Sequence, residues 1–486
     1  MASKKILQGF LVLNISIVIY GYFIGFNKSL WWDELMSIHY ARELSNLDLK
    51  EIFTQDANAP FFYLFLNSAE QIFRIFNINV DENVYLIRIV NFIGFIPILL
   101  SYKLLREEKT EIDINTIFFL LISSNYFFYY ILDLRPYFLL LSFTFLISVI
   151  NLTDTVEGKH KYLFFLSSII VSFLHIYGLT LSMSILSYRF IVNFYQKNLN
   201  RLKVDVCFIT LLFLVFFLSY FLQITNSEAM SVFGYLKFQL WFVKAFIIWA
   251  SNALIFLFFA TIFIIFFKKR KSSNISYFIK SFLNKTYFNI LGQTVPIIIL
   301  LIVVLLVSFL VFPIIHFRQL IVIYPSLALI GGLLAYDLFR NNLPKIFLIT
   351  FLLSATFINI KYYLKNIINT EQNIEWVIKK TFNQNCVGVD VYFNDDGREK
   401  ILDYINPLVQ IYSKNFRPVK SLSKLDLNNF LINKNCDILI FSFHTYDLEE
   451  NLENLNYSGL NLNIKYAPNV VKEISKSGAI VIVENK

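Results

Sequence analysis

Two adjacent carboxylates, Asp33 and Glu34, follow a pair of tryptophans in the first long polar stretch of the chain, residues 27–82. A carboxylate can act as a general base toward an attacking hydroxyl group, and it can also bind a divalent metal ion. Consecutive residues of a helix point about 100° apart, so we do not expect the two acids to act as one paired unit. The alternative is that both are solvated acids at a helix N-terminus, where negative charge is favourable in any protein.

A third acid, Asp56, opens the sequence Asp-Ala-Asn-Ala-Pro in the same polar stretch. It could position a substrate beside Asp33. The alternative is a capped helix start with Pro60 in the first turn, where proline is tolerated.

Cationic and aromatic side chains at the ends of apolar segments form a second group of candidates. Arg135 precedes Pro-Tyr137 in a short turn, Arg318 begins a late apolar segment, and Lys244 and His175 lie within or beside others. The planar guanidinium group suits a phosphate, and charged residues at membrane depth are usually functional. The alternatives are arginines that reach lipid phosphates and a core histidine bonded to a carbonyl group.

The composition predicts the elements that position these residues. The chain is 57% hydrophobic and 16% charged, whereas soluble domains contain about 25% charged residues. Apolar runs near the length of about 20 residues that a membrane helix needs predict a mainly α, polytopic membrane protein with eleven spans. They lie near residues 6–24, 84–105, 114–132, 135–152, 161–177, 178–195, 204–222, 241–267, 289–313, 317–336 and 346–362. We expect the first to be an uncleaved span, because its apolar run is long and no small-x-small cleavage site follows it.

The distribution of Lys and Arg sets the expected orientation. If residues 60–77 form an amphipathic helix on the membrane surface, most loop cations fall on one side, and only Arg135, Lys237 and Arg318 occupy the short loops of the other. The positive-inside rule then places the N-terminus in the cytoplasm and the loop of residues 25–83 outside. The formal net charge of +9 follows from this topology, so no nucleic-acid partner is expected.

The C-terminal part changes character. Residues 1–362 are expected to form the membrane domain, and residues 370–486 a small extracytoplasmic α/β domain with strands near 387–393, 437–443 and 479–483. Cys386 and Cys436 begin two of these strands, where they could form a disulfide or remain two thiols. All candidate site residues fall on the outer side. An acid, several cations and aromatic side chains there suit an anionic lipid headgroup.

The ordered set of motifs resembles GT-C glycosyltransferases of the protein O-mannosyltransferase and aminoarabinose-transferase type, over residues 1 to about 340. It consists of Asp-Glu at 33–34, Asp-Ala-Asn-Ala-Pro-Phe-Phe-Tyr at 56–63, Leu-Arg-Pro-Tyr-Phe-Leu at 134–139, His-Ile-Tyr-Gly-Leu at 175–179 and Phe-Arg-Gln-Leu-Ile-Val-Ile-Tyr-Pro-Ser-Leu-Ala-Leu at 317–329. The chain departs from the family where Asn58-Ala59-Pro60 replaces His-Pro-Pro and where Gln319 replaces an aromatic residue.

The resemblance implies inverting transfer of a sugar from a polyprenyl phosphate to an extracytoplasmic glycan, lipid or protein, in a bacterial-type inner membrane. It assigns the base to Asp33. Glu34 and Asp56 are expected to position substrate, and Arg318, Arg135 and Lys244 to hold the phosphate. No resident cofactor is expected, although the three acids could bind a divalent ion. A transporter or flippase for a lipid-linked sugar and an O-antigen ligase or polymerase are the alternatives.

Overall fold

The structure is a computed structural model that describes only part of the chain. The described residues are 2–26, 32–44, 61–78, 84–107, 112–153, 160–217, 220, 240–271, 285–310, 318–340, 345–363, 387–391, 437–442, 462–466 and 479–485. The chain divides into two compact units. The first contains residues 1–25, 43–69 and 88–367, and the second contains residues 26–42, 70–87 and 368–486. Each unit is described by itself.

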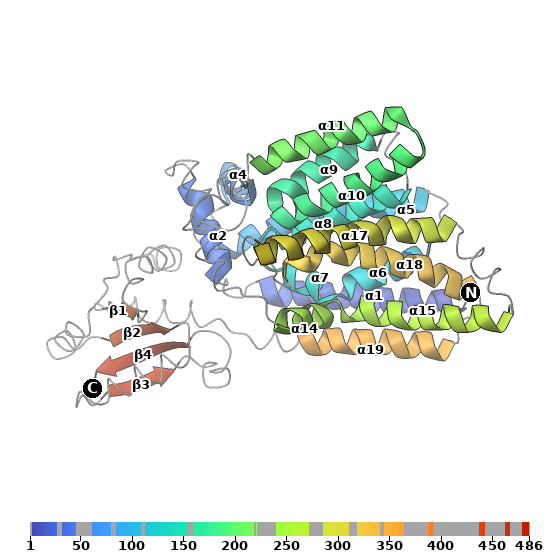
Figure 1. Ribbon diagram of the computed structural model, residues 1–486. Helices are drawn as coiled ribbons and strands as arrows, with labels where there is room; N and C mark the ends of the chain where they lie inside the picture. Colours follow the sequence, from blue (N-terminus) through green and yellow to red (C-terminus); the bar gives the residue numbers. More distant parts are fainter. Residues whose placement is uncertain are drawn as a thin grey trace. The chain divides into compact units, whose positions relative to one another are not determined.

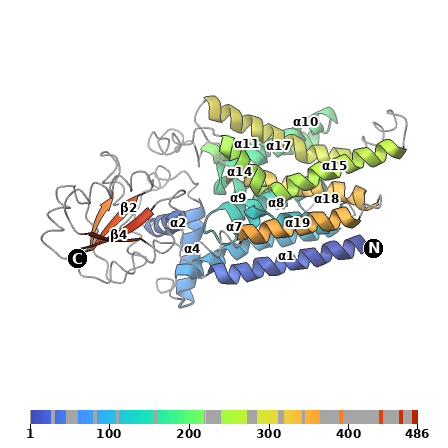
Figure 2. The same ribbon diagram turned by 90° about the horizontal axis from the view of Figure 1, so that it is seen from below.

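The first unit is a helical bundle whose long helices run side by side (Figures 1 and 2). The N-terminus lies at the end of the bundle where α15 finishes (Figure 1). Its helices are α1 (Ala2–Phe26), η1 (Val84–Gly94), α5 (Phe95–Glu107), α6 (Ile114–Ile122), α7 (Asn125–Tyr130), α8 (Tyr137–Thr153), α9 (Lys161–Leu174), α10 (Ile176–Tyr195), α11 (Leu199–Phe216), α14 (Leu240–Trp249), α15 (Ser251–Lys271), α17 (Lys285–Leu310), η4 (Gln319–Ile323), α18 (Tyr324–Arg340) and α19 (Lys345–Tyr363). The last residue of α1 and the first four residues of η1 belong to the second unit. Helix α4 (Phe61–Ile75) begins in this unit.

Helix α8 forms the core of this bundle. It is apolar on all sides and buried along nearly its whole length, which is the pattern of a helix enclosed by others. It packs against α5, α9 and α18. Its first residue, Tyr137, directly follows Pro136, so the short turn before it is held by a central and rigid element.

Local capping explains why several apolar runs are broken. The run at 114–132 divides into α6 and α7, because the Ser124 side chain accepts a hydrogen bond from the Phe127 N–H group and starts a new helix. The run at 241–267 divides into α14 and α15, which meet at 79°. In both places the structure corrects the prediction of one continuous helix.

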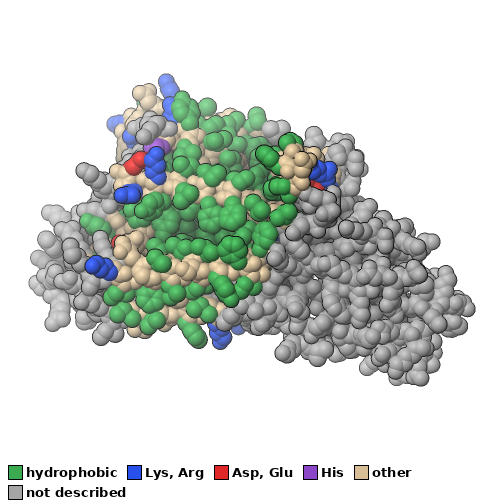
Figure 3. Space-filling view, turned by 180° about the vertical axis from the view of Figure 1, so that it is seen from behind, with side chains coloured by type: hydrophobic (Ala, Val, Ile, Leu, Met, Phe, Trp, Pro, Cys, Tyr) green, Lys and Arg blue, Asp and Glu red, His purple; other side chains and the backbone are tan. Residues whose placement is uncertain are grey.

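Among the described residues, four helices are long and apolar enough to span a membrane, or five if the bent pair α14 and α15 counts as one span. Large hydrophobic side chains are exposed along α1, α5, α11, α15 and α17. Figure 3 shows hydrophobic side chains as a broad belt over one face, with Lys and Arg side chains mainly at its edges. These features are those of a helical membrane protein. The expected total of eleven spans stays a prediction.

The second unit contains α2 (Trp32–Glu43) except for its last residue, the C-terminal part of α4 and a four-stranded sheet. The strands are β1 (Val387–Val391), β2 (Asp437–Ser442), β3 (Leu462–Tyr466) and β4 (Ala479–Asn485), in the order β1-β2-β4-β3. β1 and β2 are parallel, and the other two pairs are antiparallel. Three of these strands lie where the sequence predicted them. Cys386, Cys436 and the segments between the strands lie outside the described residues, so the α/β domain remains a prediction.

Candidate anion-binding site

Arg135 lies in the turn between α7 and α8 and is almost fully buried, at 5% exposure. Its Nε atom is 3.0 Å from Oδ2 of Asp133 and 3.1 Å from Oδ1. Asn91 of η1 fixes the turn, because its amide donates hydrogen bonds to the carbonyl oxygens of Ile131 and Asp133. The guanidinium group is therefore held at one place and is partly neutralised by a carboxylate from the same turn.

The structure brings Arg318 close to Arg135, although the two are far apart in sequence. Arg318 directly precedes η4, without a capping hydrogen bond from its side chain, and is partly exposed. Its charge interacts unfavourably with that of Arg135 and acts on the phenol groups of Tyr129, Tyr130 and Tyr137. Two like charges that act on each other repel. An anion bound between them would remove that repulsion.

Aromatic rings surround the two arginines. The Tyr130 ring centroid is 4.8 Å from that of Tyr137, 5.1 Å from Tyr129 and 5.7 Å from Trp249. The guanidinium carbon of Arg135 lies 5.7 Å from the Tyr137 centroid, within the range of a cation–π contact. The predicted site residue Tyr137 thus contacts the predicted Arg135 directly.

Tyr130 has the most unusual environment of these rings. Its side chain is fully buried, and its hydroxyl group has no hydrogen-bond partner among the described residues. The charged groups that act on this hydroxyl are Arg318 and Arg135. A buried phenol normally finds a partner, so a hydroxyl of this kind beside two arginines is a donor suited to a bound anion.

His175 lies at the break between α9 and α10 and caps α10. Its Nδ1 atom accepts a hydrogen bond from the Tyr177 N–H group at 3.1 Å, and its ring is 5.9 Å from that of Tyr137. The alternative considered from sequence was a histidine that donates to a carbonyl group. The structure differs, because Nδ1 is the acceptor and a neutral ring then carries its proton on Nε2.

Helix N-termini meet at the same cluster. α8 begins at Tyr137, α10 begins after His175, and η4 begins after Arg318. An α-helix N-terminus carries a partial positive charge and favours anions. We define the Arg135–Arg318 cluster as Tyr130, Asp133, Arg135, Tyr137, His175 and Arg318. It combines two guanidinium groups, one of them paired with the Asp133 carboxylate, with the positive ends of helix dipoles.

The remaining predicted residues of the first unit behave differently. The side chain of Lys244 is exposed on α14 and is not enclosed within a straight span. Asp56 lies outside the described residues. Asp133 and Tyr130 were missed by the sequence analysis. The dense aromatic run Asn-Tyr-Phe-Phe-Tyr-Tyr at 125–130 was the available signal for Tyr130.

Asp33 and Glu34 belong to α2 in the second unit. The helix confirms that the two acids lie in a first helical turn, and Glu34 is fully buried. The Asp33 side chain lies outside the described part.

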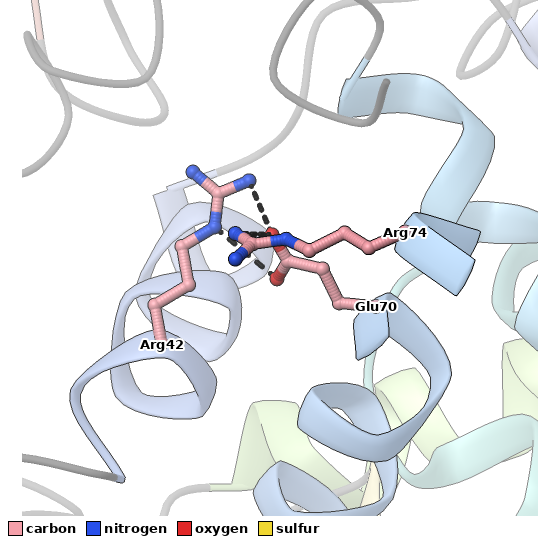
Figure 4. Close-up of polar contacts among 3 residues, drawn as sticks. All are labelled: Arg42, Glu70 and Arg74. Carbon is pink, nitrogen blue, oxygen red and sulfur yellow. Dashed lines mark hydrogen bonds and ion pairs between the residues drawn. The ribbon is translucent and has the colours of Figure 1, made fainter. Parts of the chain in front are cut away.

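An ion-pair cluster fixes α2 against α4 within the second unit. Glu70 of α4 is 2% exposed and lies 2.9 Å from Nη2 of Arg42, which comes from α2. Arg74, one turn further along α4, contacts the same carboxylate oxygen at 3.2 Å. Figure 4 shows both arginines directed toward the single carboxylate. This contact holds the helix that carries Asp33.

Within the described ranges, no group of three or more His, Cys, Asp or Glu side chains is arranged to hold a metal ion. No family model matches the chain, and no curated protein matches it.

Proposed function

We propose that the chain is an inverting glycosyltransferase of the GT-C type that transfers a sugar from a polyprenyl-phosphate donor to an extracytoplasmic acceptor. The observation that carries the proposal is the convergence of Arg135 and Arg318 in one aromatic cluster. Two arginines, a buried phenol hydroxyl and helix N-termini are the groups that bind a phosphate and stabilise the charge that develops on it.

The reaction changes the charge at two places, the acceptor hydroxyl and the donor phosphate, and a separate protein group would act at each. The acceptor hydroxyl loses a proton as its oxygen attacks the anomeric carbon, and we assign this proton to the Asp33 carboxylate. The bond between the anomeric carbon and the phosphate oxygen breaks with inversion, and its electron pair goes to the phosphate. Arg135 and Arg318 would hold that phosphate and stabilise its added charge.

The proposal includes a topology. Eleven spans, a cytoplasmic N-terminus and an extracytoplasmic C-terminal domain would place the cluster at the outer side of a bacterial-type plasma membrane. The basic residues Lys103, Arg106, Lys161 and Lys197 lie at the cytoplasmic ends of their helices in this arrangement. The donor, the acceptor and the surrounding lipid would be the partners, with no nucleic acid. A divalent ion at the acids of the outer loop is not required by the proposal.

The test is transfer by the purified full chain with a panel of polyprenyl-phosphate sugars. We expect Asp33→Asn to abolish transfer while donor binding and thermal stability stay near those of the wild type. Transfer by the Asp33→Asn protein would remove Asp33 as the base. If the Arg318→Ala variant transfers the sugar at the wild-type rate, Arg318 does not hold the phosphate.

A transporter or flippase for a lipid-linked sugar is the second candidate, because broken helices and polar side chains at the breaks are typical of transporters. Asn252, next to the α14–α15 bend, donates hydrogen bonds to the Leu120 carbonyl and to Ser123, beside the α6–α7 break. Vesicles that contain the purified protein and a fluorescent lipid-linked sugar distinguish the two candidates. Movement of the lipid between leaflets without acceptor and without transfer would support the transporter.

A further inference from the structure

We propose that helix α4 docks on the acyl chains of the lipid bilayer through one of its two apolar faces, and that this docking holds α2 in place. The docking face, the lipid-facing stripe, consists of Phe61, Leu64, Ile72 and Ile75. The sequence predicted a surface helix in this segment, but not which of its sides meets lipid. Docking of this kind does not depend on the reaction that the protein catalyses.

The exposure of its side chains separates the two faces of α4. Phe62, Tyr63 and Leu66 are almost fully buried, so one face packs against the protein. All four members of the lipid-facing stripe are exposed, and Ile75 is 76% exposed. Their positions in the sequence place them on one side of an α-helix. A continuous exposed apolar surface usually marks an interaction site, whereas single exposed apolar residues do not.

The length and direction of α4 suit a helix that lies along the membrane surface. Its 15 residues rise about 22 Å, which is less than the hydrocarbon core of about 30 Å. Residues 61–69 belong to the first unit, and they run across the direction of the long bundle helices (Figures 1 and 2). A helix that crosses membrane-spanning helices in this way lies near the plane of the bilayer.

The lipid-facing stripe continues an exposed apolar side of the bundle. Phe61 stacks on Phe173 near the end of α9, with the ring centroids 5.5 Å apart. Phe173 follows Tyr162 and Leu166 along one side of α9, and both of these side chains are exposed. The stripe therefore begins where an apolar side of the bundle ends, so the lipid that covers α9 would also reach α4.

Apolar area, not charge, would drive the docking. Arg74 is the only Lys or Arg between residues 61 and 75, and it contacts the Glu70 carboxylate at 3.2 Å. Surface helices that depend on anionic lipids carry several Lys and Arg side chains on the polar face. We therefore expect α4 to dock equally well on a zwitterionic bilayer.

The docked helix would also restrain α2. Glu70 is 2% exposed and lies 2.9 Å from Nη2 of Arg42, which belongs to α2. Both residues belong to the second unit. Glu70 lies on the same helix as Ile72 and Ile75, so a bilayer that holds these two side chains also holds the carboxylate that binds α2.

The experiment measures lipid contact at single positions of the full chain in phosphatidylcholine nanodiscs. A nitroxide label is attached to Ile72→Cys or Ile75→Cys, in a protein whose three native cysteines are replaced by serine. Collisions of the label with oxygen, which dissolves in lipid, are compared with collisions with a nickel chelate, which stays in water. Leu166→Cys on α9 is the lipid reference, and Glu107→Cys, from an exposed ion pair, is the water reference.

We expect the ratio of oxygen to nickel collisions at both stripe positions to shift from the value of the water reference to that of the lipid reference. The same ratio is expected after anionic lipid is added. The proposal is overturned if both positions match Glu107→Cys, because water then covers the stripe. It is also overturned if neither reagent reaches the labels, because protein then covers it. A ratio that rises only with anionic lipid would show that charge drives the docking.

A second measurement tests the restraint on α2. Ile72→Gln combined with Ile75→Gln reduces the apolar area of the stripe and leaves the buried face of α4 intact. We expect trypsin to cleave this variant after Arg42 about tenfold faster than the wild type in nanodiscs. Ile72→Leu combined with Ile75→Leu keeps the apolar area and should be cleaved at the wild-type rate. Equal cleavage of all three proteins would show that docking does not hold α2.

Discussion

Replacing each arginine of the cluster with alanine should have unequal effects on stability, although both changes should weaken phosphate binding. Arg135 is paired with Asp133, whose carboxylate is almost inaccessible to water. Removing one partner of a buried ion pair costs about 3 to 5 kcal/mol, because the other charge loses its compensation. We therefore expect Arg135→Ala to lower the free energy of unfolding by an amount in this range.

Arg318 presents a milder case. Its side chain is partly exposed, and solvent weakens the interactions of an exposed charge. Arg318→Ala should therefore lower the free energy of unfolding by less than Arg135→Ala does.

Ligand binding supplies the second half of the prediction. Hydrogen bonds to charged groups contribute about 1.5 to 3 kcal/mol, so losing Arg318 should weaken phosphodiester binding about 10- to 100-fold. The assay is thermal unfolding in detergent with and without a probe, a short prenyl-phosphoryl sugar that carries the phosphodiester of the proposed donor. The wild type should gain stability from the probe, and Arg318→Ala should gain little. If Arg318→Ala destabilises the ligand-free protein as much as Arg135→Ala does, Arg318 is a structural residue and the reasoning is refuted.

Two further predictions concern what positions the site. A Cβ atom at Gly178 would lie 2.3 Å from the Val171 carbonyl oxygen, so Gly178→Ala should displace the start of α10 and lower the unfolding temperature. Gly292→Ala is the matched control, because its Cβ would meet only a side chain at 3.7 Å, and equal effects would contradict the steric argument. Glu70→Gln should destabilise the α2–α4 contact by about 1 to 3 kcal/mol, measured by proteolysis of α2. The matched control is Glu107→Gln, which removes a carboxylate from an exposed ion pair and should change the free energy of unfolding by less than about 0.5 kcal/mol. A similar loss in both variants would show that the buried Glu70 ion pairs stabilise the protein no more than an exposed pair does.

The sequence predicted the helices of the bundle well, because uninterrupted apolar length is what a membrane helix requires. It did not predict where helices break. A hydropathy window averages over about 19 residues, whereas the breaks depend on single capping groups, namely the Ser124 hydroxyl and the His175 imidazole. Hydropathy alone does not distinguish a serine or histidine that caps a helix from one that lies within a helix.

The site was predictable in part for a similar physical reason. Arg135 and Arg318 were noticeable because a cation at the end of an apolar segment is costly. The sequence did not predict that the two arginines lie close together, because their proximity depends on how η4 and the α7–α8 turn pack around α8. The ion pair with Asp133 was also missed, since residues two apart contact each other only in a particular turn. Tyr130 carried no signal as a single residue, because its role follows from a hydroxyl group left without a partner.

Asp33 and Glu34 show why the burial of an acid is more informative than its position next to another acid. Glu34 is fully buried in the first turn of α2, and a buried carboxylate is usually held by partners rather than free to exchange protons with a substrate. Glu34→Gln should therefore reduce stability together with activity, and Asp33→Asn should reduce the rate of transfer alone. Measuring the rate of transfer and the unfolding temperature on both variants separates the roles. If Glu34→Gln is stable and inactive while Asp33→Asn is active, Glu34 is the base, and the chemistry assigned to Asp33 moves one residue along the helix.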